Sequence, residues 1–87
     1  MREFIVAYDI SEPRRLRKVA RILEKCGVRI EYSLFFVKAT KEEMTELAMK
    51  IAEIIDANED DVRIYEVEDY GVALGRADLL DEIYIIR

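Results

Sequence analysis

Apolar residues run almost without interruption from Phe4 to Tyr8, and the run ends at a carboxylate, Asp9. A strand with one buried face alternates apolar and polar residues, whereas a continuous apolar run indicates that both faces are buried. We therefore predict a central strand over residues 3–9. In so short a chain, helices can cover one face of this strand, and a second subunit is the economical cover for the other.

Two amphipathic helices are predicted from apolar positions that lie three and four residues apart. Pro13 favours the first turn of the first helix, and Gly27 favours its end. Thr40 and Glu43 form a capping box that begins the second helix. The apolar positions of the first helix are Leu16, Val19, Ala20 and Leu23, and those of the second are Met44, Leu47, Ala48, Ile51 and Ile55.

The other strands are predicted from β-branched and aromatic residues. Residues 28–37 form one bent strand or two strands, and we expect a bend or bulge near Ser33. Residues 61–67 form the last strand of the core. A linker or turn covers residues 68–81, and residues 83–86 form one more strand, which needs a sheet edge to pair with.

This order of elements predicts an α+β fold in a single domain of 87 residues. We assign residues 1–67 to the core and residues 68–87 to a linker and a C-terminal strand that pairs with the partner subunit. Apolar residues make up 52% of the chain and charged residues 38%, which is enough apolar surface for a folded core. No apolar run is long enough to span a membrane and no leader is evident, so we expect a cytoplasmic protein.

The single cysteine excludes an internal disulfide, and the absence of histidine excludes serine–histidine and cysteine–histidine nucleophiles. The net charge of −5 is unevenly distributed. Residues 1–30 carry a balance of +4 and residues 31–87 a balance of −9. A row of cations opposite the apolar stripe of the first helix could bind phosphates or be only a solvated face, and it comprises Arg14, Arg17, Lys18, Arg21 and Lys25.

Asp9 stands where a buried strand ends and a cationic helix begins. A carboxylate at this place can hold a hard divalent cation, and the cations beside it can neutralise phosphate. The alternative is that Asp9 only begins a turn or caps the helix, since aspartate is favoured at both places. Tyr32, Tyr65 and Tyr84 could stack on bases, but strand tyrosines favour a core or interface position.

The ordered set of Tyr8-Asp9-Ile10, the cation-rich helix start, Leu23, Gly27, Arg29 and Tyr32-Ser33-Leu34-Phe35 resembles the CRISPR-associated protein 2 family over nearly the whole chain. The resemblance implies a homodimeric, ferredoxin-like βαββαβ sandwich with an extra C-terminal strand. It also implies a metal-dependent endonuclease that acts on RNA or duplex DNA. Members of this family bridge the CRISPR integrase, CRISPR-associated protein 1, during spacer acquisition in antiviral defence.

The resemblance further implies a set of site residues. Asp9 matches the catalytic, metal-binding aspartate, and two copies across a dimer axis would share Mg²⁺ or Mn²⁺. The cationic positions of the family fall at Arg15, Arg17, Lys18 and Arg29. The residues beside the metal site are Tyr8, Ser33 and Phe35.

Two other functions are left open by the residues themselves. One is a ribonuclease toxin, because some toxin families share a small ferredoxin-like fold. The other is a non-catalytic dimer that positions duplex DNA and protein partners. The second alternative is supported by the chemistry, because each subunit supplies one obvious carboxylate and no side-chain general base.

Overall fold

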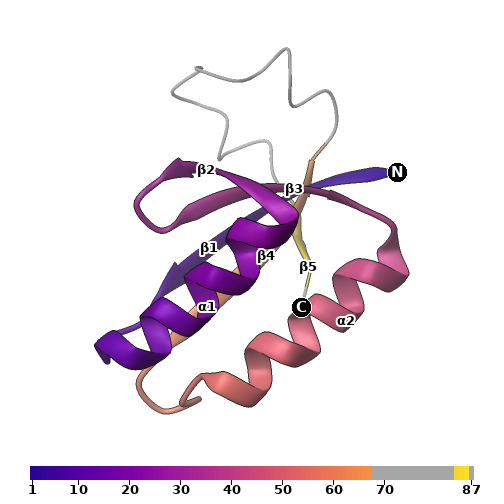
Figure 1. Ribbon diagram of the computed structural model, residues 1–87. Coiled ribbons are helices and arrows are strands. Elements are labelled where there is room, and N and C mark those ends of the chain that lie inside the picture. Colours follow the sequence, from indigo (N-terminus) through magenta and orange to yellow (C-terminus); the bar gives the residue numbers. More distant parts are fainter. Residues whose placement is uncertain (68–83, 87) are drawn as a thin grey trace.

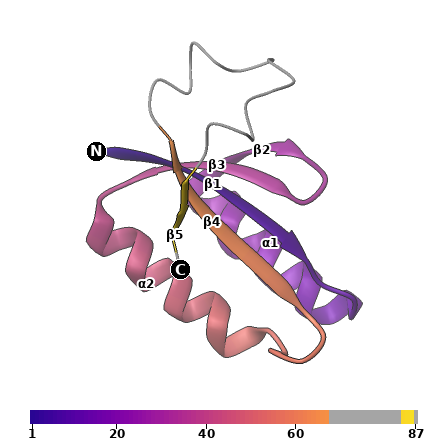
Figure 2. The ribbon, with the colours of Figure 1, turned by 180° about the vertical axis from the view of Figure 1, so that it is seen from behind.

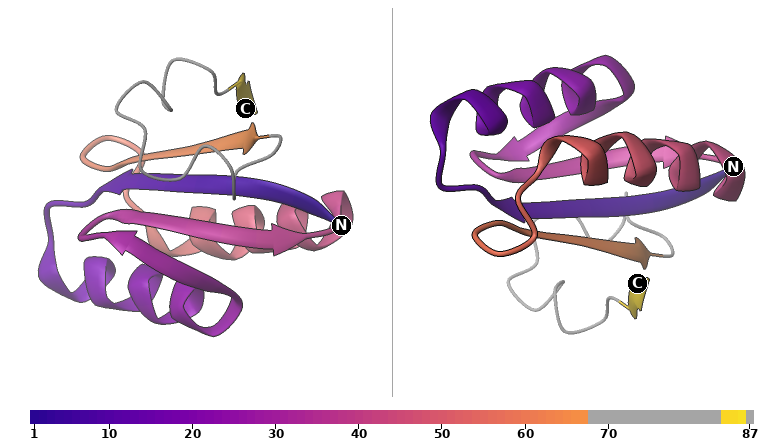
Figure 3. Two further views of the ribbon diagram at one scale, coloured as in Figure 1. Left: turned by 90° about the horizontal axis from the view of Figure 1, so that it is seen from above. Right: turned by 90° about the horizontal axis from the view of Figure 1, so that it is seen from below.

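The structure, a computed structural model, describes residues 1–67 and 84–86 (Figure 1). An antiparallel sheet has the strand order β2-β3-β1-β4-β5, and both helices lie on one of its faces (Figure 3). The elements are β1 (Arg2–Asp9), α1 (Pro13–Cys26), β2 (Gly27–Glu31), β3 (Leu34–Ala39), α2 (Lys41–Ile54), β4 (Asp61–Val67) and β5 (Tyr84–Ile86). The predicted ferredoxin-like α+β fold is confirmed.

The central strand β1 is buried on both faces, as its apolar run predicts. Phe4, Val6 and Tyr8 belong to the core cluster beneath the helices, whereas Ile5 packs in a second cluster on the other face. Ile5 is 0% exposed. Figure 2, seen from behind, shows β1 beside β4 with the helices beyond them. Successive residues of this strand therefore serve different surfaces of the molecule.

The two helices begin and pack as the sequence predicts. Pro13 is the first residue of α1, and Val19 and Leu23 are its buried residues. Thr40 and Glu43 form the capping box of α2: the Thr40 side chain accepts from the Glu43 amide, and the Glu43 side chain accepts from the Thr40 amide. No helix in the described part of the chain is long and apolar enough to cross a membrane.

The segment after α1 is a hairpin of two strands. Tyr32 and Ser33 form its turn, and the register of β2 against β3 shifts between Arg29 and Glu31. The irregularity expected near Ser33 therefore lies on β2. Of the two alternatives that the sequence allowed, one bent strand or two strands, the structure has two strands.

Gly27 ends α1 as expected, but for a different reason. Its backbone is extended, with φ −151°, so the left-handed conformation that usually selects glycine is not used here. A Cβ atom at this position would lie 2.5 Å from the Phe36 carbonyl oxygen and 2.8 Å from Val37 Cγ2. Glycine is required because β3 passes so close to the end of the helix.

The C-terminal strand β5 pairs with β4 of its own chain, with Ile64 opposite Ile86. The linker predicted over residues 68–81 lies outside the described residues. Because β4 of the same chain provides a sheet edge for β5, this strand pairs without a partner subunit. The exchange of β5 between subunits stays a prediction.

Candidate functional site

Asp9 is the last residue of β1 and is exposed. Its position places it on the same face as Ile5 and Ala7, opposite to the helices and to Tyr8. The helix cap is Glu12, whose side chain accepts from the amides of Arg14 and Arg15 at 3.1 and 2.9 Å. The interpretation of Asp9 as a cap is therefore wrong. Within the described residues the Asp9 side chain has no hydrogen bond or ion pair, so its carboxylate is available to a ligand.

A second carboxylate, Asp61, lies directly opposite Asp9 in the antiparallel pairing of β1 with β4. Directly opposite residues have Cβ atoms about 5 Å apart, and like charges at such positions repel. Asp61 accepts a hydrogen bond from Arg63 Nε at 2.9 Å, which partly offsets this repulsion. The sequence analysis missed Asp61; the only signal was that one strand ends and another begins with aspartate.

These two carboxylates are hard oxygen ligands of the kind that Mg²⁺ and Mn²⁺ prefer. The described residues contain no group of three acidic, histidine or cysteine side chains that could hold a metal ion. The described part of one chain thus offers an incomplete set of ligands at Asp9. A second copy that faces the first would double the number of carboxylates.

The sheet face that carries Asp9 is apolar over its centre. Val28, Phe36, Ile5 and Tyr65 are successive partners across four strands and form one row. Leu34 and Ala7 continue the apolar surface toward Asp9. We call this surface the open face. Its Val28 is 65% exposed, which is unusual for valine within a sheet.

The cations of α1 lie on its solvent-facing side. The predicted row is confirmed as exposed, and we call it the basic ridge: Arg14, Arg17, Lys18, Arg21 and Lys25. The α1 segment contains six cations and one acid, whereas α2 contains two cations and four acids. The helix layer therefore has a basic half and an acidic half.

Arg15 differs from the expectation that it contacts nucleic acid. Its Nε donates to Asp60 at 2.8 Å, and its Nη2 donates to Glu59 at 3.1 Å. The Asp60 side chain is 0% exposed and also accepts from the amides of Ser11 and Asp56 at 3.3 and 2.9 Å. The hydrogen bonds from Arg15 are the main cause of a lowered pKa of Asp60. Arg15 fixes the loop after α2 to the start of α1.

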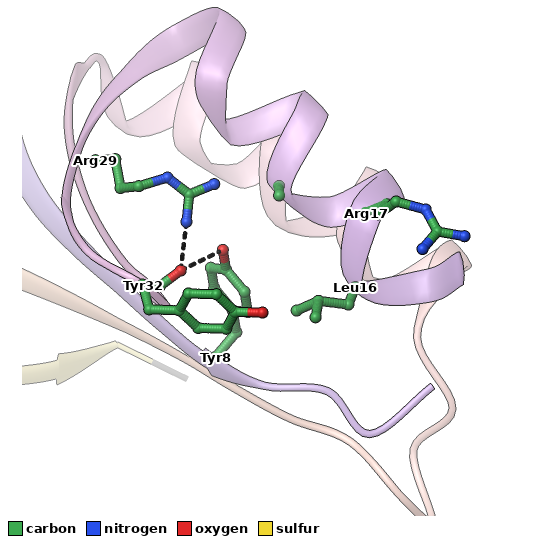
Figure 4. Close-up of a pocket in the computed structure, with 6 residues that line it drawn as sticks. Tyr8, Leu16, Arg17, Arg29 and Tyr32 are labelled. Carbon is green, nitrogen blue, oxygen red and sulfur yellow. Dashed lines mark hydrogen bonds between the residues drawn. The ribbon is translucent and has the colours of Figure 1, made fainter. Parts of the chain in front are cut away.

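Other predicted residues come together on the helix side of the sheet, among them Tyr8 and Arg29, which are shown in Figure 4. The Tyr8 hydroxyl donates to the Tyr32 carbonyl at 3.3 Å, and the Tyr8 amide donates to the Ser33 carbonyl at 3.1 Å. The Tyr8 and Phe35 rings stack, with centroids 6.2 Å apart. The Arg29 guanidinium lies 4.8 Å from the Phe35 centroid and donates to the Tyr32 carbonyl.

The single predicted site is thus divided by the sheet. Arg29 and Tyr8 lie beside α1, whereas Asp9 belongs to the open face. Burial raises the pKa of the Tyr8 hydroxyl, which therefore remains a donor at neutral pH. Tyr32 is 76% exposed in the hairpin turn, so a core position for this tyrosine is wrong.

Comparisons with known proteins identify relatives of this chain. The chain matches the family described as CRISPR associated protein Cas2 over residues 1–73. The CRISPR-associated endoribonuclease Cas2 1 of Nitrosomonas europaea is 34% identical over 85 residues, which are 95% of this chain and 81% of that protein. The CRISPR-associated endoribonuclease Cas2 2 of Thermodesulfovibrio yellowstonii is 40% identical over 62 residues, 71% of this chain and 68% of that protein.

Solved structures show the same fold. The crystal structure of Streptococcus pyogenes Cas2 has a TM-score of 0.78 at 26% identity and covers 83% of this chain and 94% of that chain. A chain of a partial Cas6-RT-Cas1--Cas2 complex has a TM-score of 0.72 at 24% identity and covers 87% and 89%; this likeness concerns the fold alone. With its sequence matched over residues 1–73, the chain belongs to the CRISPR-associated protein Cas2 family.

Proposed function

We propose that two copies of this chain form a dimer through the open face, bind nucleic acid along the basic ridge, and cut phosphodiesters with a divalent cation held by Asp9. The observation that carries the proposal is the exposed carboxylate of Asp9, which has no hydrogen bond or ion pair among the described residues, at the end of a sheet face with an apolar centre. The relatives named as endoribonucleases support the same reaction class.

The dimer is supported by the composition of the open face. An apolar row that includes the exposed Val28 is costly in water and stable when covered. A two-fold contact is self-complementary, so the same row can cover its own copy. Asp9 and Asp61 then belong to the margin of the interface, where carboxylates from both subunits can share one cation.

The chain's residues fit a divalent cation, since Asp9 is exposed and has no competing partner among the residues that the structure describes. When bound, such an ion would polarise a phosphodiester oxygen and lower the pKa of water. Asp9 would hold the ion, and the cations of the basic ridge would hold neighbouring phosphates. The chain contains no histidine, so the proton acceptor is water or phosphate rather than an imidazole.

We further propose that the dimer serves in spacer acquisition, where it binds duplex DNA and assembles with the integrase, CRISPR-associated protein 1, in the cytoplasm. Membership of the Cas2 family supports this role, and the complex of Cas1 with Cas2 is the relevant precedent. Duplex binding requires only phosphate contacts from the basic ridge, and these contacts carry no sequence information.

The decisive experiment measures cleavage of labelled RNA and duplex DNA with Mg²⁺, with Mn²⁺ and with a chelator. We expect Asp9→Asn to reduce cleavage to the level of the wild type in chelator, because the substitution keeps the size and removes the charge. Glu53→Gln is the matched control, since it removes an exposed carboxylate from α2, on the helix side of the sheet, and should leave the activity unchanged. Binding of Mn²⁺, measured by electron paramagnetic resonance, should be weakened only by Asp9→Asn.

A non-catalytic dimer is the second candidate, favoured by the absence of histidine and because the described residues contain no group of three side chains that could hold a metal ion. If Asp9→Asn cuts as fast as the wild type, the activity belongs to a contaminant and the scaffold function is the correct one. A ribonuclease toxin would instead cut cellular RNA without partners and arrest growth on expression, and these two tests separate it from both candidates.

A further inference from the structure

A small open pocket lies between α1 and the β2–β3 hairpin, on the face of the sheet opposite to Asp9. Its volume is about 150 Å³, which is the size of hollow that accommodates one aromatic ring. Tyr8, Leu16, Ala20 and Tyr32 give it an apolar lining, and the side chains of Arg17 and Arg29 complete it. Apolar walls with a few convergent charged groups are typical of ligand sites.

We propose that this pocket binds one unpaired nucleotide of a single-stranded RNA or DNA segment, with the base on the Tyr32 ring and a phosphate at Arg17. The inference rests on the proposed nucleic-acid binding and adds a specific subsite to it. The exposed Tyr32 ring offers a π-face, and aromatic side chains stack on any of the bases.

The backbone of Tyr32 is held in place by its neighbours, which fixes the point from which the ring extends. Its carbonyl accepts from both the Tyr8 hydroxyl and Arg29. In Figure 4, Leu16 points toward the two tyrosine rings, whereas the Arg17 guanidinium points outward from the same turn of α1. Arg17 also belongs to the basic ridge, so the sugar–phosphate backbone of a nucleic acid that follows the ridge reaches the mouth of the pocket.

Charge decides which ligand fits. Arg29 and Arg17 supply two positive charges, and the described lining contains no acidic side chain. An anionic phosphate joined to a flat apolar ring meets both features, and a nucleotide is such a molecule. A paired base is stacked on its neighbours inside a duplex, so the pocket selects unpaired nucleotides.

The test uses 17-nucleotide single strands of RNA and of DNA with one central 2-aminopurine, and a blunt duplex of the same sequence. The fluorescence of 2-aminopurine falls when it stacks on an aromatic ring. We expect quenching when wild-type protein is added to the single strands. Tyr32→Ala should abolish the quenching and weaken single-strand binding at least about fivefold, the effect of losing one base–aromatic stack. Tyr32→Phe should retain both.

The blunt duplex separates this inference from the proposed function. Tyr32→Ala should bind the blunt duplex as tightly as the wild type, because the basic ridge is intact. Equal loss on duplex and single strands, or no loss on either, would overturn the nucleotide subsite while leaving the basic ridge in place. If the wild type binds neither substrate, both the subsite and the proposed function are wrong. A comparison of the RNA and DNA strands shows which sugar the pocket accepts.

Discussion

Replacing Arg17 and Lys18 with alanine should reduce the salt dependence of duplex binding. An α-helix rises 1.5 Å per residue, so the basic ridge from Arg14 to Lys25 extends about 16 Å. One strand of DNA places a phosphate about every 3.4 Å along its axis, which gives about five phosphates over this length. The ridge therefore offers about as many cations as there are phosphates beside it, and each removed side chain should remove one contact.

The magnitude follows from counterion release. The slope of log K against log salt is about −0.9 for each phosphate neutralised on duplex DNA, so the loss of two contacts should flatten it by about 1.8 for each bound subunit. Between about 50 and 200 mM salt, the loss of affinity should then be about tenfold smaller for the double variant than for the wild type. The reduction should be the same for any DNA sequence, because phosphate contacts do not read bases.

Fluorescence anisotropy titrations at four salt concentrations measure this slope directly. The matched control is Lys41→Ala with Lys50→Ala, which removes two exposed cations from α2, the acidic half of the helix layer. We expect the control to keep the slope of the wild type. If the α1 double variant keeps that slope too, the cations of α1 are only a solvated helix face. If both double variants flatten it equally, net charge and not the ridge determines binding.

Two further predictions concern the dimer and the fold. Val28→Lys should raise the dimer dissociation constant in sedimentation equilibrium at least about tenfold, because it places a charge in the apolar row of the open face. The control is Met49→Lys, since Met49 of α2 is also exposed, at 62%. Equal effects of the two substitutions would refute the proposed interface. Because the pKa of Asp60 is lowered in the folded state, its contribution to the free energy of unfolding should be complete above about pH 4, the ordinary carboxyl range. This contribution should be lost as the pH falls through the lower folded-state pKa. Urea denaturation between pH 2 and 6 should show this acid-dependent fall in the wild type and in Glu59→Gln but a smaller one in Asp60→Asn, and identical profiles would contradict the role of Asp60.

Local patterns predicted much of this fold. The strand over residues 61–67 has the predicted bounds, Pro13 begins α1, and the capping box of Thr40 with Glu43 is present. Each of these features depends on residues a few positions apart, so the sequence contains all the information that is needed. The order of strands also follows, since a βαββαβ chain has few ways to cover one face of a sheet with two helices.

Features that depend on distant segments were not predictable in the same way. Arg15 resembles its neighbours in the sequence, yet it donates to Asp60, which is 45 residues away. Asp61 becomes part of the candidate metal site only through its register with Asp9. Gly27 is required by the approach of the Phe36 carbonyl, which no rule for helix ends contains.

The most consequential case is the pair Tyr8 and Asp9. Their adjacency in the sequence suggested one site, but consecutive residues of a strand point to opposite faces of the sheet. The basic ridge therefore lies on the helix side, and the carboxylates lie on the open face, where the proposed dimer would enclose them. A duplex on the basic ridge need not touch Asp9 of the same chain, whereas a strand to be cut must pass around the end of β1. This geometry allows duplex binding without cleavage, so Asp9→Asn should remove cleavage and leave duplex binding in place, whereas substitutions in the basic ridge should weaken both.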